Sequence, residues 1–244
     1  MNRFLNKEQS EKLLQTLPQT KTKYTYDPEK HRIILHDKAG NEQVYFRLPI
    51  TLSVEQQDLR PATEKVNYVV LLIQSGNCAL GYFEDGHNLD HKVFRSYMVR
   101  KKQGKSQVKY LKTKGKSRAG SRVRLGETVE FFENINGRLQ DYFEDYNVNR
   151  IAISCSKTLI PYLYGSRVST PFDKNDPRLY KIPKHVHTPI YEVLLDTNRF
   201  LQKGELVFDA AGQDTVEALL TAAGISETTS EPDDLWDEDT WEMD

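Results

Sequence analysis

The feature that most constrains the fold is an apolar stretch at residues 66–74, which contains no charged side chain. A β-rich run of this length, bounded by turn residues, is typical of a buried central strand. Turns containing Gly76 and Gly86 separate it from two further strand-like runs at 78–83 and 92–99. Strands joined through such short glycine turns pair in antiparallel fashion. The sequence therefore predicts a three-stranded antiparallel meander.

The chain after the meander alternates between helical and extended patterns. Apolar residues recur at three- and four-residue spacing from 127 to 146, which indicates a helix with one apolar stripe. Further elements are expected at 150–155 (strand), 157–164 (short helix), 179–182 (strand) and 189–201 (helix). The predicted fold class is α/β with a mixed sheet, in the element order of a ribonuclease H-like domain. A long basic loop separates its third strand from its first helix.

Residues 65–208 are expected to form this main domain, and residues 1–60 a small N-terminal accessory unit. The accessory unit is predicted to contain a short amphipathic helix that ends at Pro18 and a hairpin with strands at 32–36 and 43–48. The polar residues that follow the hairpin, up to the main domain, are expected to act as a linker.

The C-terminal region, residues 209–244, is predicted to be an acidic disordered segment. From Gly204 onward the chain has thirteen Asp and Glu residues and no Lys or Arg. Such a composition cannot bury enough apolar surface to fold by itself. The segment could dock a partner through its two Trp residues, screen the basic loop, or only aid solubility.

Composition excludes membrane and disulfide-rich classes of protein. No apolar run approaches the ~20 residues that a membrane-spanning helix needs, and the first twenty residues lack the apolar core of a secretory signal. Cys78 and Cys155 stand far apart in strand-like runs and are expected to be buried, reduced thiols. A cytoplasmic protein without a membrane partner, and monomeric, is therefore predicted.

No metal or cofactor is expected. A two-metal nuclease needs clustered carboxylates on its first strand, and residues 66–74 contain none. The pairs His87/His91 and His185/His187 lack further ligands. Exposed loop histidines are the simpler interpretation, although His185 and His187 could contact phosphates.

A strongly basic segment lies between Asp90 and Glu127. It holds thirteen Lys and Arg residues and no Asp or Glu, although the whole chain has a formal net charge of only −1. Without carboxylates the segment cannot neutralise itself, which suits it to an external polyanion, most commonly nucleic acid. The alternative is a solvated Lys-rich loop without a partner.

Two motifs in this segment carry a family resemblance. Gln103-Gly104-Lys105-Ser106-Gln107 is followed by Ala119-Gly120-Ser121 and a basic stretch that leads to Glu127. This order resembles the release-factor-like domain of the eukaryotic ankyrin-repeat and zinc-finger peptidyl-tRNA hydrolase of ribosome quality control. That domain is similar to the catalytic middle domain of eukaryotic and archaeal termination factors. The likeness covers about 66–201 and implies a compact, bacterial-type member.

The resemblance implies that the segment enters the peptidyl transferase centre and that Gln107 acts at the 3′ end of peptidyl-tRNA. A neutral amide can orient a water or a ribose hydroxyl there by hydrogen bonds. Gly104 would let the backbone approach RNA closely, with Ser106 beside the catalytic Gln107. The basic residues would hold rRNA and tRNA phosphates. These residues are Arg100, Lys101, Lys102, Lys105, Lys109, Lys112, Lys114, Lys116, Arg118, Arg122 and Arg124.

The implied partners are the large ribosomal subunit, with its 23S-type rRNA, and peptidyl-tRNA. The implied activity frees nascent chains from stalled large subunits, either by ester hydrolysis or by cleavage of the tRNA near its CCA end. The sequence departs from the family pattern at Lys105, which replaces a second glycine, and at Leu125-Gly126, which replace an Arg and an Asn. Lys105 favours the alternative of a non-catalytic ribosome- or RNA-binding factor.

Overall fold

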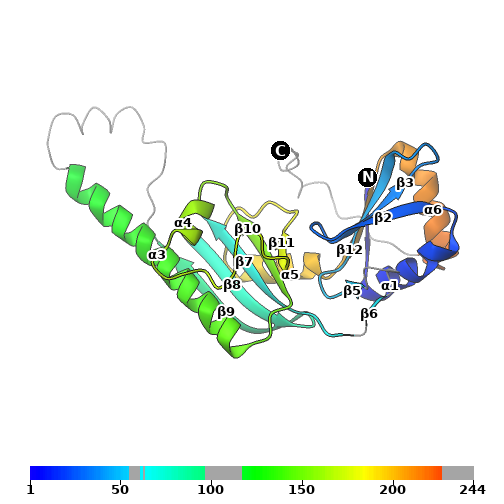
Figure 1. Cartoon of the computed structure of the whole chain (residues 1–244). Coiled ribbons are helices and arrows are strands. Elements are labelled where there is room, and N and C mark those ends of the chain that lie inside the picture. The colour runs from blue at the N-terminus through cyan, green and yellow to red at the C-terminus, as the bar shows by residue number, and fades with distance from the viewer. Residues whose placement is uncertain (55–60, 63, 97–116, 227–244) are drawn as a thin grey trace.

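The computed structural model describes residues 1–54, 61–62, 64–96 and 117–226, which form two lobes, each built on a five-stranded sheet (Figure 1). The central lobe holds the predicted meander. Its sheet has the order β11-β10-β7-β8-β9. The strands are β7 (Asn67–Gln74), β8 (Asn77–Glu84), β9 (His87–Arg95), β10 (Arg150–Cys155) and β11 (Leu179–Lys181).

Strand directions in the central sheet follow the predicted mixed pattern. β8 pairs antiparallel with both β7 and β9. β10, by contrast, runs parallel to β7, and β11 runs parallel to β10. The predicted order of three strands, helix, strand, helix, strand and helix is confirmed. The third strand begins at His87, earlier than the predicted 92, because the turn at Gly86 leads directly into pairing with β8.

Helices cover both faces of this sheet. Alternate residues of β7 point in opposite directions: Val69, Leu71 and Ile73 pack with one helix layer, and Tyr68, Val70 and Leu72 with the other. All six are fully buried, which explains why the run contains no charge. The helices are α3 (Ser117–Asp145) and α4 (Ile160–Tyr164) on the first face and α5 (Tyr191–Leu201) on the second.

The N-terminal lobe has a sheet of order β1-β12-β4-β3-β2 with helices against it. The predicted helix and hairpin are confirmed as α1, β3 and β4. The strands are β1 (Asn2–Leu5), β2 (Lys23–Asp27), β3 (Arg32–His36), β4 (Glu42–Arg47) and β12 (Gly204–Phe208). The remaining elements are α1 (Lys7–Thr16), α6 (Gln213–Ala222), the 3₁₀ turns η1 (Leu17–Gln19) and η2 (Ala210–Gly212), and the small pair β5 (Ser53–Val54) and β6 (Pro61–Ala62).

The predicted boundaries at 60 and 208 differ from this arrangement. β12 is not part of the main domain but lies between β1 and β4 in the N-terminal sheet. The prediction of disorder from 209 is wrong as far as α6, because Val216, Leu219 and Leu220 are buried in the N-terminal core. The high acid content concealed this apolar spacing. The rest of the predicted acidic segment, 227–244, lies outside the described residues.

Buried contacts join the two lobes where a linker was predicted. Ile50 donates its main-chain N–H to the Leu201 carbonyl at 2.7 Å. The Arg150 guanidinium donates to the carbonyls of Ile50 and Leu52, each at 3.0 Å. Residues 49–52 are buried, so this start of the predicted linker is a fixed part of the interface. Within the described ranges, no helix has the length and apolar character required to cross a membrane.

Candidate functional site

The predicted catalytic segment begins at the end of β9 and returns in α3. Gln107, Gly104 and Ser106 lie outside the described residues. The same holds for Arg100, Lys101, Lys102, Lys105, Lys109, Lys112, Lys114 and Lys116. Arg118, Arg122 and Arg124, by contrast, lie in the first turns of α3 and not in a loop. The helix begins ten residues before the predicted start at 127, since an isolated glycine such as Gly126 costs a helix only ~1 kcal/mol.

Both ends of the basic segment are attached to the central sheet at one place. Ser96 donates its main-chain N–H to the Gly76 carbonyl at 2.8 Å, in the turn between β7 and β8. The Ser96 hydroxyl donates to the Glu127 carbonyl at 3.2 Å. The first part of α3, residues 117–126, therefore extends about 15 Å beyond this attachment at 1.5 Å per residue. Figure 1 shows this end of the helix projecting from the lobe.

The body of α3 is held firmly against the sheet. Phe132, Ile135 and Leu139 are buried in the core between α3 and the strands. Arg138 forms an ion pair with Asp90 of β9, and its guanidinium lies 4.8 Å from the centre of the Tyr142 ring. The projecting end of α3 is thus supported by a rigid base.

The attachment point belongs to the carboxyl edge of the sheet. β9 and β10 both run parallel to β7, so the three strands end at this same edge. Their last residues are Gln74, Arg95 and Cys155. Neighbouring strands lie ~4.8 Å apart, which places Arg95 about 14 Å, or three strand spacings, from Cys155. In α/β sheets, ligands bind outside the carboxyl ends of the strands.

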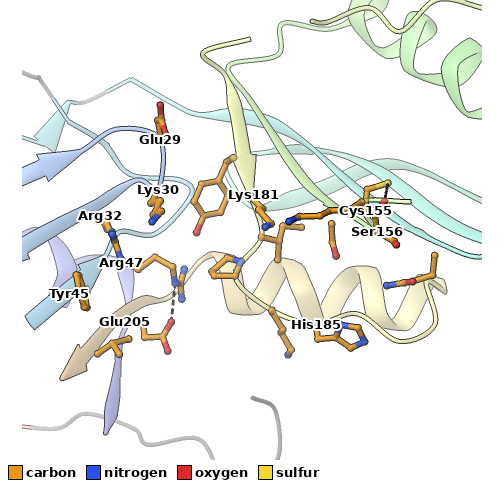
Figure 2. Close-up of a pocket in the computed structure, with 18 residues that line it drawn as sticks. Glu29, Lys30, Arg32, Tyr45, Arg47, Cys155, Ser156, Lys181, His185 and Glu205 are labelled. Carbon is orange, nitrogen blue, oxygen red and sulfur yellow. Dashed lines mark hydrogen bonds and ion pairs between the residues drawn. The ribbon is translucent and has the colours of Figure 1, made fainter. Parts of the chain in front are cut away.

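A cleft of about 470 Å³ opens at this edge, between the two lobes (Figure 2). The central lobe contributes the ends of β7, β10 and β11 and the residues after them. The N-terminal lobe contributes β3, β4, β12 and the turn before β3. The lining residues are Glu29, Lys30, Arg32, Tyr45, Arg47, Gln74, Ser154, Cys155, Ser156, Lys157, Tyr180, Lys181, Ile182, Pro183, Lys184, His185, Glu205 and Val207.

Six Lys and Arg side chains line the cleft against two Glu. One pair of opposite charges is internal: Arg47 donates from Nε to Glu205 at 3.0 Å, and both side chains are buried. The Arg47 guanidinium also lies 4.3 Å from the centre of the Phe200 ring. The cleft therefore keeps a net positive charge, unlike the chain as a whole.

The thiol in the cleft is a poor nucleophile. Burial raises the pKa of Cys155 to about 12, so the reactive thiolate is scarce at neutral pH. Cys78 is fully buried, and burial raises its pKa as well. Both residues pair with Ile73 from opposite sides, so their Cα atoms lie ~10 Å apart, too far for a disulfide. The predicted free thiols are confirmed, although Cys155 is only partly buried.

The histidine pairs contact other rings. The rings of His185 and His187 lie 4.3 Å apart, centre to centre. The His91 ring stacks on Tyr191 at 3.8 Å. In the part of the chain that the structure describes, no three His, Cys, Asp or Glu side chains gather as a metal site would require.

An α/β mixed sheet with a basic segment at its carboxyl edge is the arrangement expected of a release-factor-like protein. Residues 68–207 match the family described as the Bacteroidetes VLRF1 release factor, and the chain belongs to that family. No curated protein matches it by sequence. A solved structure titled "Vms1 mitochondrial localization core" is similar with a TM-score of 0.39 at 12% identity, over 82% of this chain and 76% of that chain.

Sequence reasoning did not identify the cleft. Arg47 and Glu205 lie in segments 158 residues apart, and only the assembly of β12 beside β4 brings them together. The available signal was the interpretation that His185 and His187 could contact phosphates, and His185 does line the cleft.

Proposed function

We propose that this protein is a ribosome-associated release factor that frees nascent chains from peptidyl-tRNA on stalled large ribosomal subunits. Membership of a release-factor family carries this proposal. The finer part of the proposal, the action on peptidyl-tRNA, is supported by the resemblance of the motifs at 103–107 and 119–121 to the ankyrin-repeat and zinc-finger peptidyl-tRNA hydrolase. Gln107 is the proposed catalytic residue, and the surrounding Lys and Arg residues are the proposed RNA contacts.

The geometry around the segment supports this role. A catalytic element that must reach into the peptidyl transferase centre needs length beyond the globular body and a fixed base. The helical extension of α3 from Gly126 back to Ser117 supplies length, and the Ser96–Glu127 hydrogen bond joins the two ends of the segment. The absence of carboxylates from 91 to 126 avoids repulsion from rRNA phosphates.

Two reactions suit a segment of this composition. In the first, a water adds to the ester carbonyl and the bond to the ribose 3′ oxygen breaks, which yields a free carboxylic acid and an intact tRNA. In the second, a ribose 2′-hydroxyl attacks the adjacent phosphate and the 5′ oxygen of the next nucleotide leaves. The peptide is then released with the 3′ fragment of the tRNA. The Gln107 amide would orient the attacking oxygen in either case.

The test uses large subunits that carry labelled peptidyl-tRNA, with both the peptide and the tRNA 3′ end resolved. We expect release by the wild-type protein and a loss of at least about 100-fold for Gln107→Ala, since general acid–base and positioning groups contribute about that much or more. Gln15→Ala, an exposed change on α1, is the matched control. An intact CCA end identifies ester hydrolysis, and a shortened one identifies tRNA cleavage.

The second candidate, a non-catalytic binding factor, rests on Lys105, which places a charged side chain where the family has glycine. It predicts tight binding to large subunits, no peptide release, and no effect of Gln107→Ala. Multiple Lys→Ala changes would abolish binding and flatten its salt dependence. Lys105→Gly gives a further test of the two candidates. If peptide release appears only in this variant, the Lys105 side chain is the reason that the wild-type protein lacks the activity.

A further inference from the structure

We infer that the cleft between the lobes binds a nucleotide through its phosphate, either as a free molecule or as the end of an RNA chain. The site is separate from the basic segment, and the inference holds whether or not Gln107 is catalytic. Its volume of about 470 Å³ lies in the usual range of ~300–1,000 Å³ for small-ligand sites.

Two buried polar groups in the lining lack partners among the described residues. Nη1 of Arg47 makes no hydrogen bond, although Nε is bound to Glu205 and Nη2 donates to the Phe200 carbonyl at 3.4 Å. The Tyr180 hydroxyl also makes none, and its side chain is only 5% exposed. Arg47 is 6% exposed. Buried donors without partners are costly, so such groups commonly mark a ligand position.

The two groups lie close together and suit one anion. Burial raises the pKa of Tyr180, and the neighbouring Arg47 guanidinium opposes this effect through its charge and as a nearby donor to the hydroxyl, although the two make no hydrogen bond of ordinary geometry. The hydroxyl therefore remains protonated at neutral pH and can donate. A guanidinium and a phenolic O–H that lie close together can donate to two oxygens of one phosphate.

Further cations surround this position. Lys181 ends β11, Lys184 follows that strand, and Lys157 follows β10. Lys30 lines the cleft from the opposite lobe (Figure 2). Among the described residues none of the four has an ion-pair partner. The Lys184 ammonium lies 5.3 Å from the centre of the Phe200 ring, the same ring that the Arg47 guanidinium contacts. Unpaired cations around a buried guanidinium favour a ligand with one or more negative charges.

Part of the remaining lining is apolar, which suits a ligand that also has a flat or apolar part. The ring of Tyr180 and the side chains of Ile182, Pro183 and Val207 form these walls. A nucleotide combines a phosphate with a base and sugar of this character. The partly buried Cys155 thiol is neutral, so it does not oppose an anion.

Binding is measured by calorimetry on the full chain with three probes. These are adenosine monophosphate, the RNA trinucleotide CCA, and the same RNA without its terminal adenosine. Binding of the monophosphate assigns the site to a free nucleotide. Binding of CCA alone, lost when its terminal adenosine is removed, assigns it to an RNA end. Absence of binding by every probe would overturn the inference.

Tyr180→Phe is the sharpest variant, because it removes a hydroxyl that makes no hydrogen bond of ordinary geometry among the described residues and keeps the packed ring beside Arg47. We expect unchanged thermal stability and roughly three- to tenfold weaker binding of the probe, the worth of one hydrogen bond. The double change Lys181→Ala with Lys184→Ala should weaken binding by about tenfold or more. Lys21→Ala with Lys38→Ala, on exposed positions of the other lobe, is the charge-matched control. Equal affinity in the cleft and control variants would also overturn the inference.

Discussion

The Ser96 hydroxyl donates a hydrogen bond of 3.2 Å to the main-chain carbonyl of Glu127, which lies 31 residues further along the chain. This bond closes the base of the entire basic segment. The carbonyl belongs to a turn inside α3, so the contact ties the end of β9 to the side of a helix. It leaves ten helical residues free to project away from the sheet.

Ser96→Ala should reduce peptide release more than stability. The loss of one hydrogen bond costs about 0.5–1.5 kcal/mol of unfolding free energy, whereas release depends on the position of the segment. Urea unfolding and single-turnover release measure the two effects. Ser75→Ala, at an exposed turn position nearby, is the control. Equal release by wild type and Ser96→Ala would show that the attachment does not position the segment.

Arg150→Met should weaken the joint between the lobes. The side chain is partly buried, and its guanidinium donates to the carbonyls of Ile50 and Leu52. Its removal leaves two buried acceptors unpaired, at about 1–3 kcal/mol each. We expect a loss of about 2–4 kcal/mol of unfolding free energy and, in calorimetry, two separated transitions in place of one. Arg167→Met, whose side chain is 87% exposed, should change little; similar losses in both variants would contradict the prediction.

Stability should fall below about pH 6.5 because of His31. Burial, aided by the charge of Arg150, lowers the pKa of this histidine well below its usual value of 6.5. As the pH falls, His31 therefore binds a proton in the unfolded chain while it stays neutral in the folded protein. The contribution of His31 to the free energy of unfolding is fully present above the pKa of this residue in the unfolded chain. It is lost as the pH falls toward the pKa of His31 in the folded protein. Between pH 7.5 and 5.5 the loss from one such group is about 1.4 kcal/mol.

Urea unfolding at these two pH values measures the loss. In His31→Gln the pH-dependent part should disappear, although the variant is less stable throughout, because the ring contacts Tyr26 at 2.9 Å and the Pro49 carbonyl at 3.2 Å. His187→Gln, at an exposed position, should keep the wild-type slope. If His31→Gln kept the wild-type dependence of unfolding free energy on pH, His31 would not be the cause of that dependence.

Two glycine substitutions should have opposite effects on the stability of the fold. An added Cβ at Gly137 of α3 meets nothing within 4 Å, so Gly137→Ala should stabilise the helix by about 1 kcal/mol. At Gly81 of β8 the same atom lies 2.9 Å from both Leu194 and Phe83. Gly81→Ala should therefore destabilise the packing of α5 on the sheet by about 1–3 kcal/mol. Thermal unfolding compares them, and a stable Gly81→Ala protein would show that α5 can shift.

Local sequence patterns predicted the central lobe well. Its strands and helices appear where apolar alternation and helical spacing placed them, and β7 is buried on both faces as a charge-free run requires. The start of α3 was placed too late, because the apolar stripe begins only near 127 and the preceding residues, Gly120 and Gly126 among them, do not continue it. In a helix supported by its buried C-terminal half, these glycines are tolerated.

The sequence by itself determined the basic segment, the family motifs and most individual elements, because charge and periodicity are properties of neighbouring residues. Only the tertiary structure decided that β12 joins the N-terminal sheet, that α6 folds within an acidic region, and that Arg47 meets Glu205. A strand carries little information about which distant strand it pairs with. That choice depends on the joint burial of apolar faces from both ends of the chain, and the cleft exists because this burial brings the two lobes together.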